Sequence, residues 1–222
     1  DLDPREHRLH YDVVSNGVLW FLHHDLFDRV HRPRFDRRFR DAWDAYVGVN
    51  ERFAGATDAR AAEGDIVLVQ DYQLSLVPAF LRRRRPDLRI VHFTHTPFCG
   101  PDAIRVLPDD VAAQLCESLA GVPSGFHTER WASSFHASAR AALGPGAEIV
   151  APFAASLGPD PDALAAVADE PAARAAASRF GLSPLVLWRT SRSPGRQSAS
   201  TWRANTCSKP RSFAAAVSSE ES

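Results

Sequence analysis

Two short runs of apolar and β-branched residues constrain the fold more than any other feature of this sequence. They occupy 65–70 (DIVLVQ) and 88–94 (LRIVHFT). The first run is typical of a strand buried on both faces of a parallel sheet, and the second predicts another strand. Weaker strand patterns follow at 122–126 and 148–153, and helical spacing occupies 73–85, 106–119 and 128–143. This alternation predicts an α/β fold with a parallel sheet and right-handed crossovers.

The region before the first strand carries apolar residues at helical spacing. We expect a helix over 17–24, capped by Asn16 or Ser15, and a second over 37–54 with one apolar stripe. Pro78 falls inside the predicted helix 73–85 and weakens that prediction. The arginine run 82–85 at its end is expected to be a solvated last turn that complements the helix dipole.

Composition excludes several classes of protein. The chain has 45% hydrophobic and 24% charged residues and a net charge of −1, as in an ordinary globular protein. No apolar run reaches the ~18 residues of a membrane span, and the charge is not that of a nucleic-acid binder. The histidines are too scattered to predict a metal site, and Cys99, Cys116 and Cys207 match no zinc or disulfide spacing, which favours the reducing cytoplasm.

The last part of the chain differs in character from the rest. Residues 190–222 hold nine serines and no periodic apolar pattern. We expect loop or disorder there. Because the change is abrupt, our hypothesis is that the tail is translated in a shifted reading frame from about 186–190, which resequencing the coding DNA would test.

Asp71 and His95 each follow one of the two strongest predicted strands. In an open parallel sheet, ligands bind beyond the carboxyl ends of the strands, so neighbouring strands would bring both side chains into one crevice. A carboxylate there can accept hydrogen bonds from sugar hydroxyls, and a histidine can donate to a hydroxyl or to developing negative charge. The alternative is that Asp71 caps the following helix and His95 fills a turn.

Five stretches resemble the trehalose-6-phosphate synthase family of glycosyltransferases (family 20). They are 11–20 (YDVVSNGVLW), 43–53 (WDAYVGVNERF), 64–78 (GDIVLVQDYQLSLVP), 92–108 (HFTHTPFCGPDAIRVLP) and 125–128 (GFHT). Their order and spacing fit the family over most of 8–155, and 95–111 is closest to actinobacterial members. The resemblance implies the incomplete N-terminal half of a GT-B glycosyltransferase, with a Rossmann-like parallel sheet.

The domain organisation follows from the same resemblance. Residues 1–182 would be the acceptor-binding N-terminal domain, lacking the family's first strand and glycine-rich loop. Residues 183–222 would begin the donor domain and pass into an aberrant tail. The resemblance leaves a homo-oligomer of the full-length protein open.

The activity implied is retaining transfer of glucose, without a metal ion or cofactor, from UDP-, GDP- or ADP-glucose to glucose 6-phosphate, giving α,α-trehalose 6-phosphate. Tyr11 and Trp20 match the family's acceptor-binding aromatics, and Asp71 matches the acceptor-binding aspartate. His95 matches the histidine beside the donor glucose, and Arg189 stands where the family has an arginine for the donor phosphates. Asp71 and His95 would be the catalytic pair.

The sequence departs from the family pattern at two places. Gln70 stands where many members have histidine, a change we expect to be tolerated because both side chains can form hydrogen bonds, and 191–196 (SRSPGR) lacks the family's donor-binding lysine. Because the resemblance includes no donor half of the cleft, we expect this chain alone to be inactive. The alternatives are a non-catalytic remnant that binds a sugar phosphate, or a related family member that makes another glycosyl phosphate.

Overall fold

The structure is a computed structural model that describes residues 2–28, 32–158, 160–179 and 214–216. The chain divides into two compact units, residues 1–156 with 210–222, and residues 157–209. The strands of the first unit are β1 (Ile66–Gln70), β2 (Arg89–Thr94), β3 (Ser124–Phe126), β4 (Phe153–Ala154) and β5 (Ala214–Ala216). Its helices are α1 (Pro4–Arg8), η1 (Leu9–Leu19), α2 (Trp20–His23), α3 (Arg37–Asp58), η2 (Tyr72–Leu74), α4 (Val77–Arg84), α5 (Pro101–Ile104), α6 (Asp109–Ala120) and α7 (Glu129–Leu143). The second unit contains α8 (Pro161–Asp169) and α9 (Pro171–Arg179).

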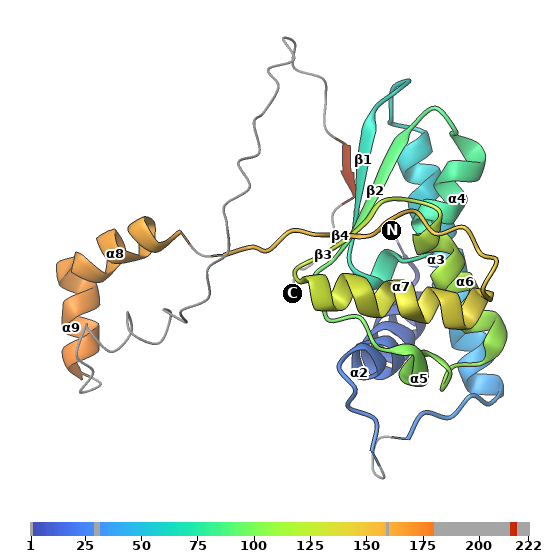
Figure 1. The fold of residues 1–222 in the computed structure, drawn as a ribbon, viewed down its shortest axis with the longest axis horizontal. Coiled ribbons are helices and arrows are strands. Elements are labelled where there is room, and N and C mark those ends of the chain that lie inside the picture. Colours follow the sequence, from blue (N-terminus) through green and yellow to red (C-terminus); the bar gives the residue numbers. More distant parts are fainter. Residues whose placement is uncertain (1, 29–31, 159, 180–213, 217–222) are drawn as a thin grey trace. The chain divides into compact units, whose positions relative to one another are not determined.

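The strands of the described residues form one parallel sheet in the order β4-β3-β2-β1-β5 (Figure 1). Gln70 at the end of β1 is level with Phe93 of β2, and Thr94 of β2 is level with Phe126 of β3. The predicted α/β fold and parallel pairing are confirmed. Three successive strands therefore end at one edge of the sheet.

Helices α3, α4, α6 and α7 lie on one side of the sheet (Figure 1). Val67 and Val69 of β1 and Ile90 of β2 point to that side and are buried against α3 and α4. The alternate residues are more open, and Ile66 is 36% exposed. Our expectation that the strand at 65–70 is buried on both faces was therefore wrong, because the burial along β1 alternates as in a sheet with one well-covered face.

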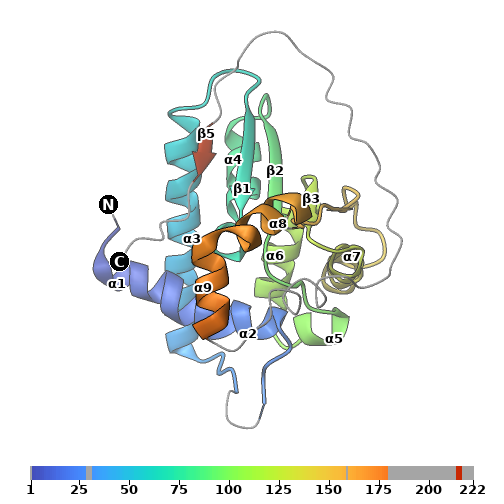
Figure 2. The same ribbon diagram turned by 90° about the vertical axis from the view of Figure 1, so that its left-hand side faces the viewer.

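The helix expected over 17–24 is the end of a longer helical segment. That segment begins at Pro4, is capped by the Asp3 carboxylate, and becomes the π-helix η1 from Leu9 to Leu19 before α2. It crosses α3 (Figure 2), with Val14, Val18 and Leu22 packed against that helix in the main core. Ser15 and Asn16, the expected caps, lie inside η1 because the helix starts earlier.

Prolines account for the other shifted helix boundaries. The helix expected over 73–85 divides into the 3-10 turn η2 and α4, with Pro78 in the first turn of α4, where its missing N–H costs no hydrogen bond. The helix expected over 106–119 begins at Asp109, because Pro108 takes the position before it. The strand expected at 148–153 shortens to β4.

One element of the tail differs from the expectation of loop or disorder. Residues 214–216 form β5, which pairs in parallel with Val67–Val69 of β1. Because a strand edge offers free N–H and C=O groups, even a short alanine segment can pair with it. The proposed boundary between residues 182 and 183 lies outside the described residues.

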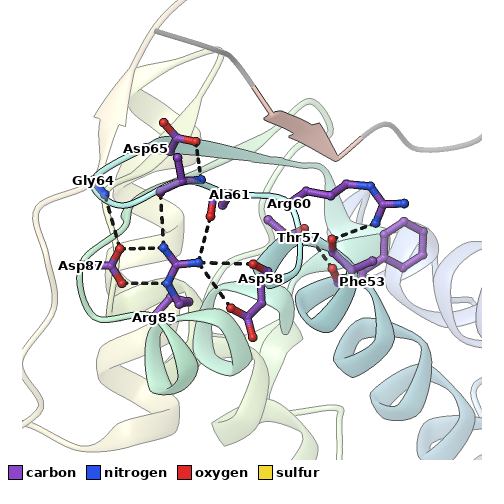
Figure 3. Close-up of polar contacts among 11 residues, drawn as sticks. Phe53, Thr57, Asp58, Arg60, Ala61, Gly64, Asp65, Arg85 and Asp87 are labelled. Carbon is purple, nitrogen blue, oxygen red and sulfur yellow. Dashed lines mark hydrogen bonds and ion pairs between the residues drawn. The ribbon is translucent and has the colours of Figure 1, made fainter.

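The arginine run at the end of α4 does more than complement a dipole. The Arg85 guanidinium forms a two-pronged ion pair with Asp87, at 2.9 and 2.8 Å, and also donates to the carbonyl oxygens of Asp58, Ala61 and Ala62 (Figure 3). The Asp87 carboxylate accepts from the N–H of Gly64, and Arg85 lowers the pKa of that carboxyl to about 2. Arg85 thus ties the loop before β1 to the turn before β2.

Candidate active site at the carboxyl ends of the strands

Asp71 and His95 meet where β1 and β2 end. The backbone N–H of Asp71 donates to the carbonyl oxygen of Phe93 at 2.7 Å, which extends the sheet pairing past β1. The Asp71 Oδ1 accepts from the backbone N–H of His95 at 3.2 Å and from that of Tyr72 at 3.0 Å. The two positions are therefore neighbours at the strand ends, and Asp71 also caps the next helical turn, as in the alternative.

The backbone of Asp71 is strained. Its φ of 63° and ψ of 173° lie in a region that is essentially reserved for glycine and costs about 1–3 kcal/mol for other residues. The conformation is held by neighbouring strands, since the buried His92 Nε2 donates to the Asp71 carbonyl oxygen at 3.1 Å. Burial lowers the pKa of His92 to about 4, so this imidazole is neutral near pH 7. Strain of this kind is characteristic of functional positions.

A buried polar network under η2 supports the loop after Asp71. The Tyr46 hydroxyl donates to the Tyr72 carbonyl oxygen at 2.6 Å, and Asn50 donates to the Gln73 carbonyl oxygen at 3.1 Å. His10 Nε2 also donates to Gln73, at 2.9 Å, and burial lowers the pKa of that histidine. These hydrogen bonds were not predicted from the sequence. The available signal was Tyr46, which lies in the apolar stripe of α3, where a buried hydroxyl needs a partner.

The π-helix η1, which carries Tyr11, is joined to the Asp71 loop through Tyr72. The Tyr72 hydroxyl donates to Asn16 Oδ1 of η1 at 2.8 Å. Burial, followed by the nearby Asp71 and Tyr11, raises the pKa of Tyr72 to about 12, so this hydroxyl keeps its proton. The half-buried Tyr11 ring stacks on His7 at 5.5 Å between centroids.

The π-helix brings Tyr11 and Trp20 toward the same side of their helical segment. They are nine residues apart, about two and a half turns of an α-helix, which would place them on opposite sides. A π-helix has about 4.4 residues per turn, so nine residues make about two full turns and return to the same side. The winding reaches Trp20, whose N–H donates to the Ser15 carbonyl five residues back.

Trp20 stands apart from the Asp71 and His95 pair. Its ring packs on His24 at 4.2 Å between centroids. His24 lines a cavity of about 340 Å³ whose wall also includes Pro97, Arg130 and Trp131. Within the part of the chain that the structure describes, no hydrogen bond or ring contact joins Trp20 to Asp71 or His95.

The His95 side chain lies between Gln70 and His127. His95 Nε2 is 2.6 Å from Gln70 Oε1, and His95 Nδ1 is 3.2 Å from His127 Nε2. His127 follows β3, so each of three adjacent strands supplies one member of this row. Sequence analysis quoted His127 within the 125–128 motif without giving it a role; its position directly after a predicted strand was the available signal.

Arg189, the residue expected to bind the donor phosphates, lies outside the described residues. Among the residues that the structure describes, no three histidine, cysteine, aspartate or glutamate side chains are grouped so that they could hold a metal ion. Within those same residues, no helix has the length and apolar content needed to cross a membrane.

Comparison with known proteins identifies the family. The model of "Glycosyltransferase family 20" matches residues 2–155, which include Tyr11, Trp20, Asp71 and His95. This chain belongs to glycosyltransferase family 20. The family match confirms the resemblance inferred from the sequence motifs.

Relatives in family 20 agree with this assignment. The chain is 44% identical over 127 residues to the trehalose-6-phosphate synthase of Mycobacterium sp. strain KMS, covering 57% of this chain and 24% of that protein. It is 43% identical over 136 residues to the synthase of Mycolicibacterium vanbaalenii, covering 61% and 26%. The chain thus spans about a quarter of the length of these curated relatives.

Solved structures of the family share the fold. An α,α-trehalose-phosphate synthase (UDP-forming) from Burkholderia vietnamiensis matches with a TM-score of 0.67 and 26% identity, covering 81% of this chain and 41% of that chain. A structure described as trehalose-6-phosphate from E. coli bound with UDP-2-fluoro glucose matches with a TM-score of 0.64 and 27% identity, covering 77% and 38%. The chain therefore has the fold of an N-terminal part of a GT-B glycosyltransferase.

Proposed function

We propose that this chain is the acceptor-binding part of a retaining glycosyltransferase that moves glucose from a nucleotide-glucose to glucose 6-phosphate, giving α,α-trehalose 6-phosphate. The family match supports the reaction class. The observation that carries the proposal for this chain is the contact between the strained Asp71 and His95. The relatives are synthases of this name, and one family structure holds a UDP-sugar analogue.

Asp71 is suited to orient the attacking hydroxyl of the acceptor. Its Oδ1 is occupied by two backbone N–H groups, whereas its Oδ2 accepts no hydrogen bond from the described residues. The free oxygen can accept from a sugar hydroxyl, and the strained backbone fixes its direction. Orientation of this kind is a large part of catalysis where the reacting groups form no bond to the protein.

His95 would lie beside the donor glucose and stabilise the transition state. Its imidazole is exposed at the sheet edge, where an N–H can donate to a donor hydroxyl. In the same proposal, the Tyr11 hydroxyl and the Trp20 ring hold the acceptor, and Arg189 contacts the donor phosphates. The nucleotide is UDP, GDP or ADP, and the UDP-sugar structure of the relative favours UDP.

The domain boundary is also part of the proposal. Residues 1–182 bind the acceptor, and 183–222 begin the donor-binding part. Because the chain spans about a quarter of its relatives, we expect it to bind glucose 6-phosphate without turnover. The test of turnover is release of nucleoside diphosphate from UDP-glucose in the presence of glucose 6-phosphate.

Calorimetric titration with glucose 6-phosphate tests the acceptor assignment. We expect binding by the 222-residue chain, weakened at least about tenfold in Asp71→Asn, because the amide replaces the free carboxylate oxygen with a weaker acceptor or a donor. Asp41→Asn changes an exposed aspartate of α3 and is the matched control. Equal affinities of wild type and Asp71→Asn would contradict the assignment.

A further inference from the structure

The row Gln70, His95 and His127 has a defined order of donors and acceptors. Gln70 Oε1 is an acceptor, so at 2.6 Å His95 Nε2 carries the proton. The other ring nitrogen of His95 is then a bare acceptor. His127 Nε2, 3.2 Å away, must therefore donate to it.

The far end of the row supports this order. His127 Nδ1 is buried and has no hydrogen-bond partner among the described residues. With the proton on Nε2, the unpartnered atom is an acceptor. In the reverse order, with the Gln70 amide donating, the same buried atom would be an unpaired N–H, and orphaned buried N–H groups are rarer than under-satisfied acceptors. The first order is therefore favoured.

Aromatic packing holds the two imidazoles in this arrangement. The Phe93 ring lies 5.0 Å from His95 and 5.1 Å from His127, between centroids. Phe93 is itself pressed against the sheet at Gly125, where an added Cβ would be 2.6 Å from the Phe93 ring and 2.5 Å from that of Phe153. The Phe93 ring is therefore fixed against the sheet and packs on both imidazoles.

We propose that His127 is a positioning residue that holds His95 in the tautomer with its proton on Nε2. His95 then presents Nε2–H at the strand ends, and a sugar oxygen replaces Gln70 as its acceptor. The tautomer follows from the hydrogen bonds of Gln70, His95 and His127 alone, whereas the contact with a sugar oxygen rests on the proposed function.

The tautomer is measured by 15N NMR of the histidine side chains of the 222-residue chain at pH 8, with His95 assigned by loss of its signals in His95→Gln. The wild type is expected to show a protonated Nε2 and a bare Nδ1 on His95. His127→Asn, whose amide cannot reach the Nε2 position, is expected to lower the ratio of Nε2–H to Nδ1–H about fivefold, the effect of one net hydrogen bond. His127→Gln places an amide N–H near the original Nε2 and is expected to restore the ratio.

His136→Gln on α7 is the control for general effects of losing a histidine, and it is expected to leave the His95 signals unchanged. A proton on Nδ1 of His95 in the wild type would overturn the proposal without any variant. So would an unchanged ratio in a folded His127→Asn protein.

Addition of glucose 6-phosphate and UDP-glucose separates this inference from the proposed function. Movement of the His95 Nε2 signal on addition, with the tautomer kept, supports both. The expected tautomer with no response to either sugar overturns the exchange of Gln70 for a sugar oxygen and counts against the proposed function, while the positioning role of His127 stands.

Discussion

The Asp71 carboxylate accepts a hydrogen bond from the backbone N–H of His95 at 3.2 Å, which joins the ends of two neighbouring strands. A second bond, from the Tyr72 N–H at 3.0 Å, holds the same oxygen. The cost of this arrangement is the left-handed backbone of Asp71. The strained backbone of Asp71 lowers the stability of the fold, whereas its carboxylate holds the site together. Substitutions at position 71 can separate these two effects.

Glycine at position 71 should be tolerated better than alanine. Both Asp71→Gly and Asp71→Ala lose the carboxylate, but only glycine relieves the strain at φ 63°. We expect Asp71→Gly to be more stable than Asp71→Ala by about 1–3 kcal/mol in urea unfolding. Neither variant should bind glucose 6-phosphate as the wild type does. An alanine variant as stable as the glycine variant would show that this backbone is not strained in solution.

The sheet and its site were predictable because the residues after β1 and β2 follow from strand periodicity alone. Adjacent parallel strands end at one edge, so Asp71 and His95 had to be close if the strands were neighbours. The structure confirms that contact. The roles of Tyr11, Trp20 and Arg189 came from resemblance and stay predictions.

Other features could not be predicted because they depend on contacts between distant segments. The π-winding of η1 has no sequence periodicity of its own, and it leaves Ser15 inside a helix rather than at its start. The role of Arg85 required the loop at Ala61 and Ala62 to be placed beside α4. The hydrogen bond of His127 to His95 required the third strand to be in register.

Gly17 should be intolerant of alanine although it lies in a helix. A Cβ there would be 2.9 Å from the Asp12 carbonyl oxygen, so the backbone of η1 would have to shift. Gly48 of α3 has no atom within 4 Å of its added Cβ and is the matched control. We expect Gly48→Ala to stabilise by about 0.5–1 kcal/mol and Gly17→Ala to destabilise, as measured by urea unfolding followed by circular dichroism. A gain in both variants would contradict the close contact inside η1.

Buried histidines should make the protein acid-sensitive. Burial lowers the pKa of His92 to about 4 and that of His23 to about 3, against 6.5 for the ordinary group. Below pH 6.5 these two histidines bind protons in the unfolded chain but stay neutral in the folded chain. The free energy of unfolding therefore falls as the pH is lowered. The expected slope is at most ~1.4 kcal/mol per pH unit for each histidine between pH 6 and 4.5.

His92→Gln tests this linkage, because glutamine keeps an N–H for the Asp71 carbonyl oxygen and removes the titrating group. Urea unfolding at several pH values between 6 and 4.5 is expected to give a shallower slope for His92→Gln than for the wild type. His136→Gln removes a histidine of α7 and is the control for general effects of losing a histidine. Parallel slopes for wild type and His92→Gln would mean that folding does not lower the pKa of His92.

Arg85 should stabilise the loop before β1 through its fork geometry rather than its charge alone. Lysine keeps the charge but cannot bind the Asp87 carboxylate with two parallel N–H groups and also reach the carbonyl oxygens of Asp58 and Ala61. We expect Arg85→Lys to lower the melting temperature. It should also speed hydrogen exchange at the N–H of Gly64, because that N–H donates to the Asp87 carboxylate held by Arg85. Arg40→Lys, which alters a single exposed ion pair with Asp110, is the control and should change neither. Equal exchange at Gly64 in wild type and Arg85→Lys would show that charge, not the fork, holds this loop.

The ion pair of Arg85 with Asp87 should also make the loop sensitive to acid. Since the pKa of Asp87 is about 2, against an ordinary value of 3.8, the stabilisation by this pair should be complete above pH 4 and be lost as the pH falls toward 2.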